Sequence, residues 1–240
     1  MSAIKIENID IPVASDNINL KASIYYTEKT PPKAPFVINL AGLLDHRESY
    51  FVRFYSEKFA KAGYYVLSYD YRAHGETKKQ TGHRSWYRMV IDIFKDIQLV
   101  LDWLIQSQSQ RLSDQNIFLF GRSIGGAIIL TYGYNDLRVK KLIALCTRYD
   151  YHTTNVKFSE EIIKKISPRY FLKKDDKNID RILIAHCKDD KRIPFENVYH
   201  IKNHLNLNEK NVLIYEDGGH SFKGHREELF ESCLEFIKKL

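Results

Sequence analysis

Residues 116–130, NIFLFGRSIGGAIIL, decide the fold of this chain. Five residues of strand character, 116–120, lead into a turn, and the small and aliphatic residues after the turn indicate a helix. The turn itself, residues 121–125, is sharp, and Gly121 and Gly125 let the backbone pass close to its neighbours. We therefore expect Ser123 to stand at the apex in a strained conformation, with its hydroxyl beside the first amides of the helix.

The spacing G-x-S-x-G around Ser123 is typical of a nucleophilic serine, because the amide of Ile124 then points at an oxygen that develops negative charge. A serine at a strand-to-helix junction is also a common N-cap. The context favours the nucleophile, since a strand ends at Gly121 and Gly126 lets the helix lie close to a neighbouring strand.

The length of 240 residues suffices for one α/β domain with a full core, so a single domain over residues 1–240 is predicted. The formal net charge is +7, and the lysines and arginines are spread along the chain without a basic run. This pattern predicts a solvated surface and no nucleic-acid partner.

The N-terminal segment MSAIKIENIDIP carries charges where a signal peptide needs an apolar core, and no apolar run is long enough to span a membrane. The three cysteines, Cys146, Cys187 and Cys233, lack metal-ligand spacing and are expected to be reduced, mostly buried thiols. We expect a cytoplasmic protein that contacts no membrane and holds neither a metal nor an organic cofactor.

Strands alternate with helices through most of the chain. The apolar pattern predicts a hairpin over 4–13 and 18–26, followed by strands at 36–40, 64–69, 116–120, 139–145, 181–186 and 211–215. Helices are predicted at 49–62, 86–105, 159–166, 196–205 and 222–239. The alternation predicts a mostly parallel, eight-stranded sheet with helices on both faces and a site at the carboxyl ends of the strands. Residues 147–179 interrupt the rhythm and are predicted to form a small cap.

A serine hydroxyl attacks well only when a base takes its proton, and the base works best when a carboxylate fixes its tautomer. His220 follows the last predicted strand, where two glycines precede it and let the chain fold back over the site. The acid is expected from the loop after the preceding strand, which contains Asp189 and Asp190. We favour Asp190, four residues before Pro194, and keep Asp189 as the alternative.

Two other histidines compete for the role of the base. His225 falls inside the predicted last helix, at least one turn from the strand end, and His186 lies on a strand terminus, where a histidine is usually packed and hydrogen-bonded. Both positions fit the role less well than the loop position of His220.

The chain resembles the α/β-hydrolase superfamily over nearly its whole length, as a serine esterase or lipase-like member with a short cap. Residues 70–77, DYRAHGET, are similar to the family's D-x-R-G-H-G-x-S, and residues 186–194, HCKDDKRIP, are similar to H-G-x-x-D-x-x-V-P. The family's G-x-S-x-G and G-G-H also occur, in the expected order. The resemblance implies that Ser123 is the nucleophile, Asp190 the orienting acid and His220 the general base.

The resemblance also implies an oxyanion hole made by the backbone amides of Ile124 and of Leu43, which follows Gly42 after the third strand. Here the sequence departs from the family, because Ala41 stands where many members have histidine, and a side chain that usually braces the loop is absent. Cys187 likewise replaces the usual glycine beside the acid.

The predicted cap is short and rich in aromatic residues, which suggests a compact, mostly apolar acyl or aryl substrate. Gly42, Arg122, Tyr149 and Tyr151 are the predicted substrate-binding residues. The cap's aromatics form its own core in the alternative interpretation.

Three functions remain open. The leading hypothesis is a serine hydrolase, a carboxylesterase that cleaves small acyl or aryl esters through an acyl-enzyme on Ser123. The second uses the same triad as a thioesterase, an amidase or peptidase, or a C–C hydrolase. The third is a non-catalytic binding protein on the same fold. The expected partner is a small-molecule ester, and a homodimer is left open.

Overall fold

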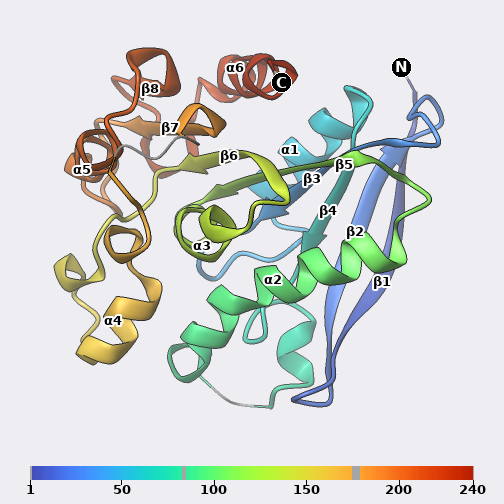
Figure 1. Cartoon of the computed structure of the whole chain (residues 1–240), viewed down its shortest axis with the longest axis horizontal. Coiled ribbons are helices and arrows are strands. Elements are labelled where there is room, and N and C mark those ends of the chain that lie inside the picture. The colour runs from blue at the N-terminus through green and yellow to red at the C-terminus, as the bar shows by residue number, and fades with distance from the viewer. Residues whose placement is uncertain (1, 83–84, 175–178, 240) are drawn as a thin grey trace. The chain divides into compact units, whose positions relative to one another are not determined.

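The computed structural model describes residues 2–82, 85–174 and 179–239 (Figure 1). The chain forms two compact units, Met1–Leu119 and Phe120–Leu240. Strand β5 (Leu112–Arg122) begins in the first unit and ends in the second. The single-domain organisation expected from the sequence stays a prediction.

The first unit is built on a hairpin of β1 (Ile4–Val13) and β2 (Ile18–Thr27), whose register closes at the pair Val13 and Ile18. Strand β4 (Tyr65–Tyr69) pairs antiparallel with β2 and parallel with β3 (Ala34–Leu40). The strand order in this unit is β1-β2-β4-β3-β5. Strands β3 and β4 are almost wholly buried, which explains their continuous apolar sequences.

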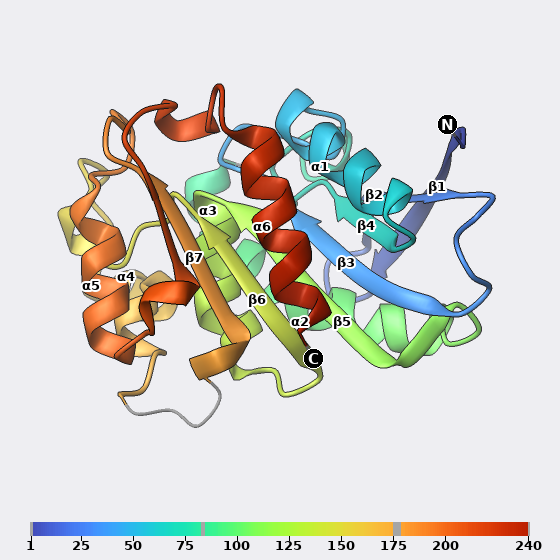
Figure 2. The same cartoon turned by 90° about the horizontal axis from the view of Figure 1, so that it is seen from above.

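Two helices cover opposite faces of these strands, α1 (Tyr50–Lys61) and α2 (Val90–Ser107) (Figure 2). Each buries one apolar stripe, as the helical spacing predicts. The helix predicted from residue 86 starts with a 3-10 turn, η2 (Trp86–Met89), and becomes α-helical at Val90.

The second unit contains the end of β5 followed by the parallel strands β6 (Val139–Leu145), β7 (Ile182–Cys187) and β8 (Val212–Tyr215), in the order β5-β6-β7-β8. Helix α3 (Ile124–Ile128) continues into a π-helical turn, η3 (Ile129–Gly133). It lies on the face of the strands opposite to α6 (Arg226–Lys238) (Figures 1 and 2). Helix α5 (Glu196–Leu205) packs against β7.

The predicted fold class is confirmed, with strands that are mostly parallel and helices on both faces. The predicted cap holds helix α4 (Glu160–Ile166) between 3-10 turns, and its residues 175–178 lie outside the described part of the chain. The predicted start of the last helix at residue 222 is wrong. The chain turns through left-handed backbone at Phe222 (φ 49°) and Gly224 (φ 91°), so α6 starts only at Arg226.

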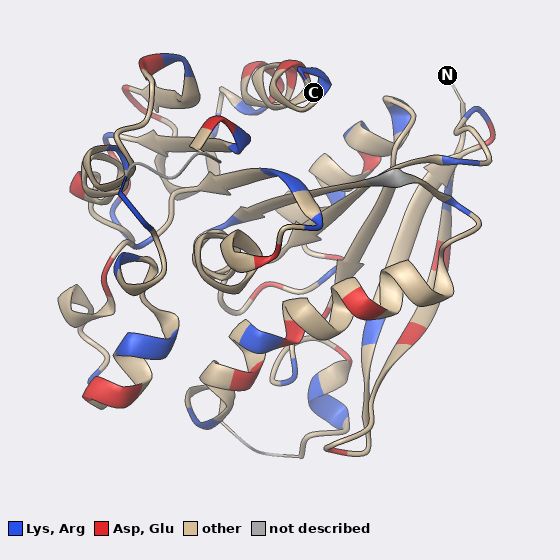
Figure 3. Ribbon diagram, viewed as in Figure 1, with Lys and Arg blue, Asp and Glu red and all other residues tan. Residues whose placement is uncertain are grey.

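The charged residues are distributed as the sequence predicts, since Lys and Arg occur in both units and are interspersed with Asp and Glu along the ribbon (Figure 3). Among the described residues, no helix is both long and apolar enough to cross a membrane. All three cysteines are buried, as the sequence predicts, and none of them forms a disulfide.

A glycine in the loop after β4 offers a test of this fold. Gly75 has φ 48°, and a Cβ on it would lie 2.2 Å from Asp70 Oδ2. Gly82 has a similar φ of 66°, with no described atom within 4 Å of such a Cβ. We expect Gly82→Ala to cost about 1 kcal/mol of unfolding free energy from backbone strain alone. Gly75→Ala adds the clash with a buried carboxylate and should cost more than about 3 kcal/mol.

Urea denaturation of the two alanine variants measures both costs. Equal losses of stability would contradict the close approach of Gly75 to Asp70.

Candidate active site

Ser123 lies between β5 and α3 with φ 61° and ψ −119°, a conformation that residues other than glycine rarely adopt. Its N–H donates to Leu145 O at 2.8 Å, and its own carbonyl accepts from Thr147 Oγ1 at 2.8 Å and from Ala127 N at 3.1 Å. These bonds tie both sides of the serine to the end of β6 and to the first turn of α3. The sharp, strained turn predicted from the sequence is therefore present.

The close approach expected at Gly126 is also confirmed. A Cβ on Gly126 would lie 2.7 Å from Thr147 Cβ, closer than carbon atoms approach, so only glycine fits beside the end of β6. Thr147 in turn donates to the Ser123 carbonyl, which makes the glycine and the threonine a matched pair that supports the turn.

Asp190 and His220 are brought together from two separate loops. His220 Nδ1 lies 2.7 Å from Asp190 Oδ2, and both side chains are buried, with exposed fractions of 9% and 0%. Because a carboxylate only accepts, Nδ1 carries the hydrogen and Nε2 is left as the proton acceptor. Burial lowers the pKa of His220 against the raising effect of Asp190, and the positive charge of Arg122 lowers it further. The imidazole is therefore neutral at pH 7.

A second histidine, His186, supports the same carboxylate. Its Nε2 lies 3.1 Å from Ile193 O and 3.3 Å from Asp190 Oδ2, so one N–H is shared between two acceptors. The sequence places His186 on a strand terminus and expects it to be packed and hydrogen-bonded, which is confirmed. Its contact with the acid was missed, although it opens the motif at residues 186–194 that resembles the family pattern.

The backbone completes the surroundings of Asp190. Its Oδ1 accepts from Arg192 N at 2.8 Å and from Ile193 N at 3.1 Å. Burial alone would raise the pKa of Asp190, but these bonds and those from His186 and His220 hold it well below its usual range. Asp190 is thus a carboxylate at neutral pH.

The neighbouring Asp189 binds the backbone of the His220 loop and not the imidazole. Its Oδ1 accepts from Gly219 N at 2.7 Å, which fastens the loop that carries His220. The two adjacent aspartates therefore contact the same loop at two points, one at the imidazole and one at the backbone. The geometry favours Asp190 over Asp189 as the partner of His220.

Arg122 also contacts the His220 loop. Its guanidinium donates to Ser221 Oγ at 2.7 Å and reaches His220 O at 3.4 Å. Arg122 precedes Ser123 directly, so this side chain links the serine turn to the histidine loop. Among the described residues, the His220 ring has its side-chain hydrogen bond to Asp190 and none to Ser123 Oγ. Such bonds are commonly long without substrate and tighten in the complex.

The loop expected to supply the second oxyanion donor lies in the first unit. Gly42 and Leu43 form a turn in which Asp45 N donates to Gly42 O at 3.1 Å and the exposed Leu44 has φ 67°. Tyr71 OH donates to Ala41 O at 2.8 Å. This bond holds the loop at Ala41, the position where many members of the family have histidine.

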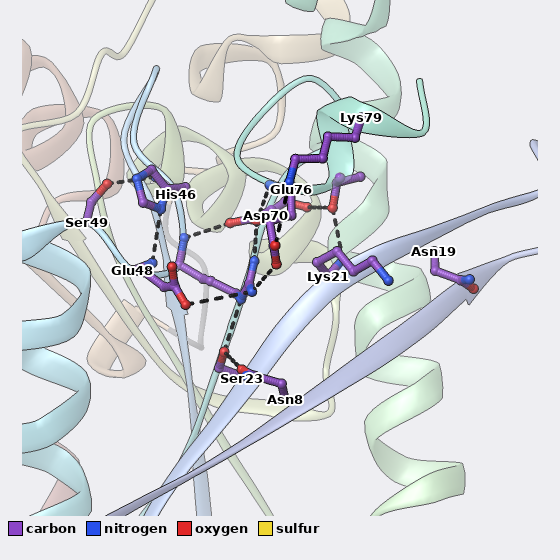
Figure 4. Close-up of polar contacts among 12 residues, drawn as sticks. Asn8, Asn19, Lys21, Ser23, His46, Glu48, Ser49, Asp70, Glu76 and Lys79 are labelled. Atoms are coloured by element: carbon purple, nitrogen blue, oxygen red, sulfur yellow. Dashed lines mark hydrogen bonds and ion pairs between the residues drawn. The ribbon is translucent and has the colours of Figure 1, made fainter. Parts of the chain in front are cut away.

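The same loop is held at its far end by the buried Arg47. Figure 4 shows the side chains of Asp70 and Glu76, which belong to this group of polar contacts. Asp70 Oδ1 accepts from Arg47 N at 2.8 Å, and Asp70 Oδ2 accepts from the Arg47 guanidinium at 2.5 Å and from Glu76 N at 2.8 Å. Glu76 also pairs with the guanidinium. The sequence motif at residues 70–77 could have indicated this role, because it contains Asp70, Tyr71 and Glu76.

Two cap residues predicted to bind substrate have structural partners. Tyr149 OH lies 2.7 Å from His204 Nδ1, and its ring stacks on His200 at 5.7 Å between centroids. The Tyr151 ring packs edge-on against Phe158 at 6.2 Å. Tyr149 also lines a cavity of about 300 Å³ with Arg169 and His200 among others. Substrate binding by Gly42, Arg122, Tyr149 and Tyr151 stays a prediction.

One group of side chains in the described part of the chain has the composition of a metal site. Ligand atoms of Cys146, His186 and Asp190 lie within 4.8 Å of one another, and all three residues are buried. The sequence spacing gave no sign of it, because the three residues come from separate segments. His186 and Asp190 are already engaged in hydrogen bonds, and in this arrangement His186 stabilises the Asp190 carboxylate.

A strained serine after a strand, a buried Asp–His pair and parallel strands with helices on both faces define an α/β hydrolase. The sequence profile of the family described as "Serine aminopeptidase, S33" matches residues 31–181. This is more than half of the chain, and the chain belongs to this family.

Similar proteins have several activities in their names. The quorum-quenching protein AidA of Acinetobacter baumannii (strain MDR-ZJ06) is 28% identical over 141 residues, which are 57% of this chain and 43% of AidA. The acylaminoacyl peptidase of Pyrococcus horikoshii has a TM-score of 0.75 at 17% identity, covering 100% of this chain and 42% of the peptidase. This chain thus spans less than half the length of either protein.

A third similar protein matches over nearly its full length. Est1E from Butyrivibrio proteoclasticus, solved with ferulic acid bound, has a TM-score of 0.73 at 19% identity and covers 96% of this chain and 98% of Est1E. At these identities the two structural likenesses establish the fold alone.

The two aspartates give the first test of this site. Asp190→Asn removes the carboxylate that holds Nδ1 protonated, so we expect turnover to fall about 10³- to 10⁴-fold. Asp189→Asn keeps an oxygen that accepts from Gly219 N and should reduce turnover less than about tenfold. Steady-state kinetics on both variants measures the difference. A larger loss in Asp189→Asn would reverse the assignment.

The lowered pKa of His220 predicts the acid limb of activity. Protonation of this imidazole removes the base, so kcat/KM should fall as the pH drops through its pKa. Because burial lowers that pKa, the midpoint should lie below the ordinary histidine value of about 6.5. A profile of kcat/KM from pH 4.5 to 8.5 measures it, and a midpoint above the ordinary value would contradict the burial of His220.

Proposed function

We propose that this protein is a serine hydrolase that cleaves small carboxylic esters, acting as a carboxylesterase through an acyl-enzyme on Ser123. The observation that carries the proposal is the 2.7 Å bond between Asp190 and His220, which leaves Nε2 free to take a proton. Ser123 stands in strained backbone at the end of β5, and its neighbour Arg122 contacts the loop of His220.

The reaction proceeds in two halves. His220 Nε2 takes the proton of Ser123 Oγ as the oxygen attacks the ester carbonyl, and the imidazolium then gives this proton to the leaving alkoxide. Water attacks the acyl-enzyme with the help of the same nitrogen, and the carboxylic acid leaves. Asp190 stays ionised throughout, because its pKa is held far below the working pH, and it stabilises the imidazolium.

The developing oxyanion needs a backbone donor. The amide of Ile124 is the first of helix α3 and has no carbonyl available within that helix, so it is the first candidate. The amide of Leu43 stays the predicted second donor, on a loop braced by Tyr71 and Arg47.

Small esters are favoured by two observations. The described cap is short, with helix α4 of seven residues between 3-10 turns. Est1E, which covers the same length of chain, was solved with ferulic acid, an aromatic carboxylic acid, bound to it. An aromatic or short acyl group is therefore the acyl portion we propose.

A peptidase is the second candidate, since the family profile is that of a serine aminopeptidase and one structural neighbour is an acylaminoacyl peptidase. Both substrates use the same acyl-enzyme. They differ in the leaving group, since an amine must be protonated before it leaves whereas an aryl oxide departs easily.

Labelling with a fluorophosphonate and peptide mass mapping tests the nucleophile, and turnover of p-nitrophenyl esters of increasing acyl length tests the substrate class. We expect an adduct on Ser123 and turnover that peaks at short or aromatic acyl groups. Aminoacyl p-nitroanilides, assayed in parallel, should be cleaved at least about a hundredfold more slowly.

Ser123→Ala is the control, and it should lose both the adduct and turnover while unfolding at an unchanged temperature. An adduct with faster anilide than ester turnover would establish the peptidase. A protein without adduct and without turnover would be a binding protein, and the proposal would be wrong.

A further inference from the structure

A cavity of about 460 Å³ lies in the second unit, away from the strand ends that carry Ser123 and Asp190. Its walls come from the starts of three parallel strands and from the last turns of α6. In a parallel sheet the starts and the ends of strands lie at opposite edges, so this cavity is separate from the candidate active site. Its volume suits a small organic molecule.

The lysine on β6 is unusual in this cavity. Lys141 is half-buried, and its Nζ lies 4.7 Å from the Phe236 ring centroid and 3.4 Å from the carbonyl oxygen of Asp180. No carboxylate of the described residues lies within 4.0 Å of this ammonium. Burial lowers the pKa of Lys141, the negative charge of the nearby Asp180 raises it, and the positive charge of Lys210, which lines the same cavity, lowers it.

The charged residues that line the cavity leave it with a net positive charge. Lys239, the C-cap residue of α6, forms an ion pair with Glu235, so Lys141 and Lys210 remain against the single exposed carboxylate of Asp180. Lys210 has no ion pair with any carboxylate in the described ranges. An anion placed between Lys141 and Lys210 would relieve the repulsion between them.

Two further features of the cavity indicate which groups a bound anion would carry besides its charge. Leu183, Leu213 and Phe236 give the cavity an apolar wall. Asn211 also lines it, is 3% exposed, and has an amide nitrogen without a hydrogen-bond partner among the described residues. A buried donor without a partner commonly marks a site that a water or a ligand completes.

We propose that this cavity binds a small anion with an apolar body, an aromatic carboxylate or phosphate ester, whose charged head lies between Lys141 and Lys210. The apolar body lies against Leu183 and Leu213. This site is independent of the triad, so it stands or fails apart from the proposed esterase activity.

Isothermal titration calorimetry with four probes tests the site. Phenyl phosphate and benzoate carry both charge and ring, inorganic phosphate carries only charge, and phenol carries only the ring. We expect at least one of the first two to bind about tenfold more tightly than phosphate or phenol. The tighter of the two names the head group. Equal affinity for phenol would remove the role of the lysines and overturn the proposal.

Three methionine variants locate the binding. Lys141→Met and Lys210→Met each remove one charge and keep an apolar stem, and each should weaken the tighter probe about tenfold. Lys140→Met is the matched control, because Lys140 is exposed on the same strand and does not line the cavity; its affinity should stay within about twofold.

Thermal unfolding checks that the variants fold. If Lys141→Met is unstable, Lys210→Met alone tests the role of the lysines, because Lys210 is exposed. The proposal would be overturned if none of the four probes bound, or if Lys210→Met bound the tighter probe with unchanged affinity. Loss of binding in Ser123→Ala would place the ligand in the active site and would overturn it as well.

Discussion

The strained backbone of Ser123 is the constraint on which the candidate site depends. Left-handed backbone at a serine costs on the order of 1–3 kcal/mol, and it persists only where the surroundings fix it from several sides. Here Leu145 accepts the serine N–H, Thr147 binds the serine carbonyl, and Gly126 leaves room for Thr147. The strain is thus held by the end of β6 rather than by the turn alone, and a substitution at Gly126 would act on the serine without touching it.

Asp190 organises the other half of the site by a balance of burial and hydrogen bonding. A side chain without solvent exposure would normally prefer to be neutral, but four donors surround this carboxylate and keep it ionised. His220 binds the carboxylate through Nδ1, which leaves its Nε2 as the proton acceptor. His186 donates its single N–H to both Asp190 and Ile193, so it stabilises the loop and the charge together.

A loop of the first unit is supported by buried charges. In the first unit, Arg47 and Asp70 form a buried ion pair that also binds the backbone at Arg47 and at Glu76. A buried pair adds little net stability, but the loss of one partner is costly because the other charge stays buried without compensation. The pair therefore fixes the course of the loop that contains Gly42 and Leu43 more than it stabilises the unit.

The sequence by itself determined the alternation of strands and helices, the serine turn and the His220 loop, because apolar periodicity and the glycines around Ser123 and His220 are local properties of the chain. Only the tertiary structure decided between Asp189 and Asp190, since both follow the same strand and differ only in direction. The contacts of His186, Tyr71 and Lys141 were likewise not predictable from the sequence. Tyr71 and Lys141 contact segments far apart in the sequence, and which side chains meet there follows from packing in three dimensions. His186 contacts residues only four and seven positions away, but the course of the loop between them is set by the tertiary structure.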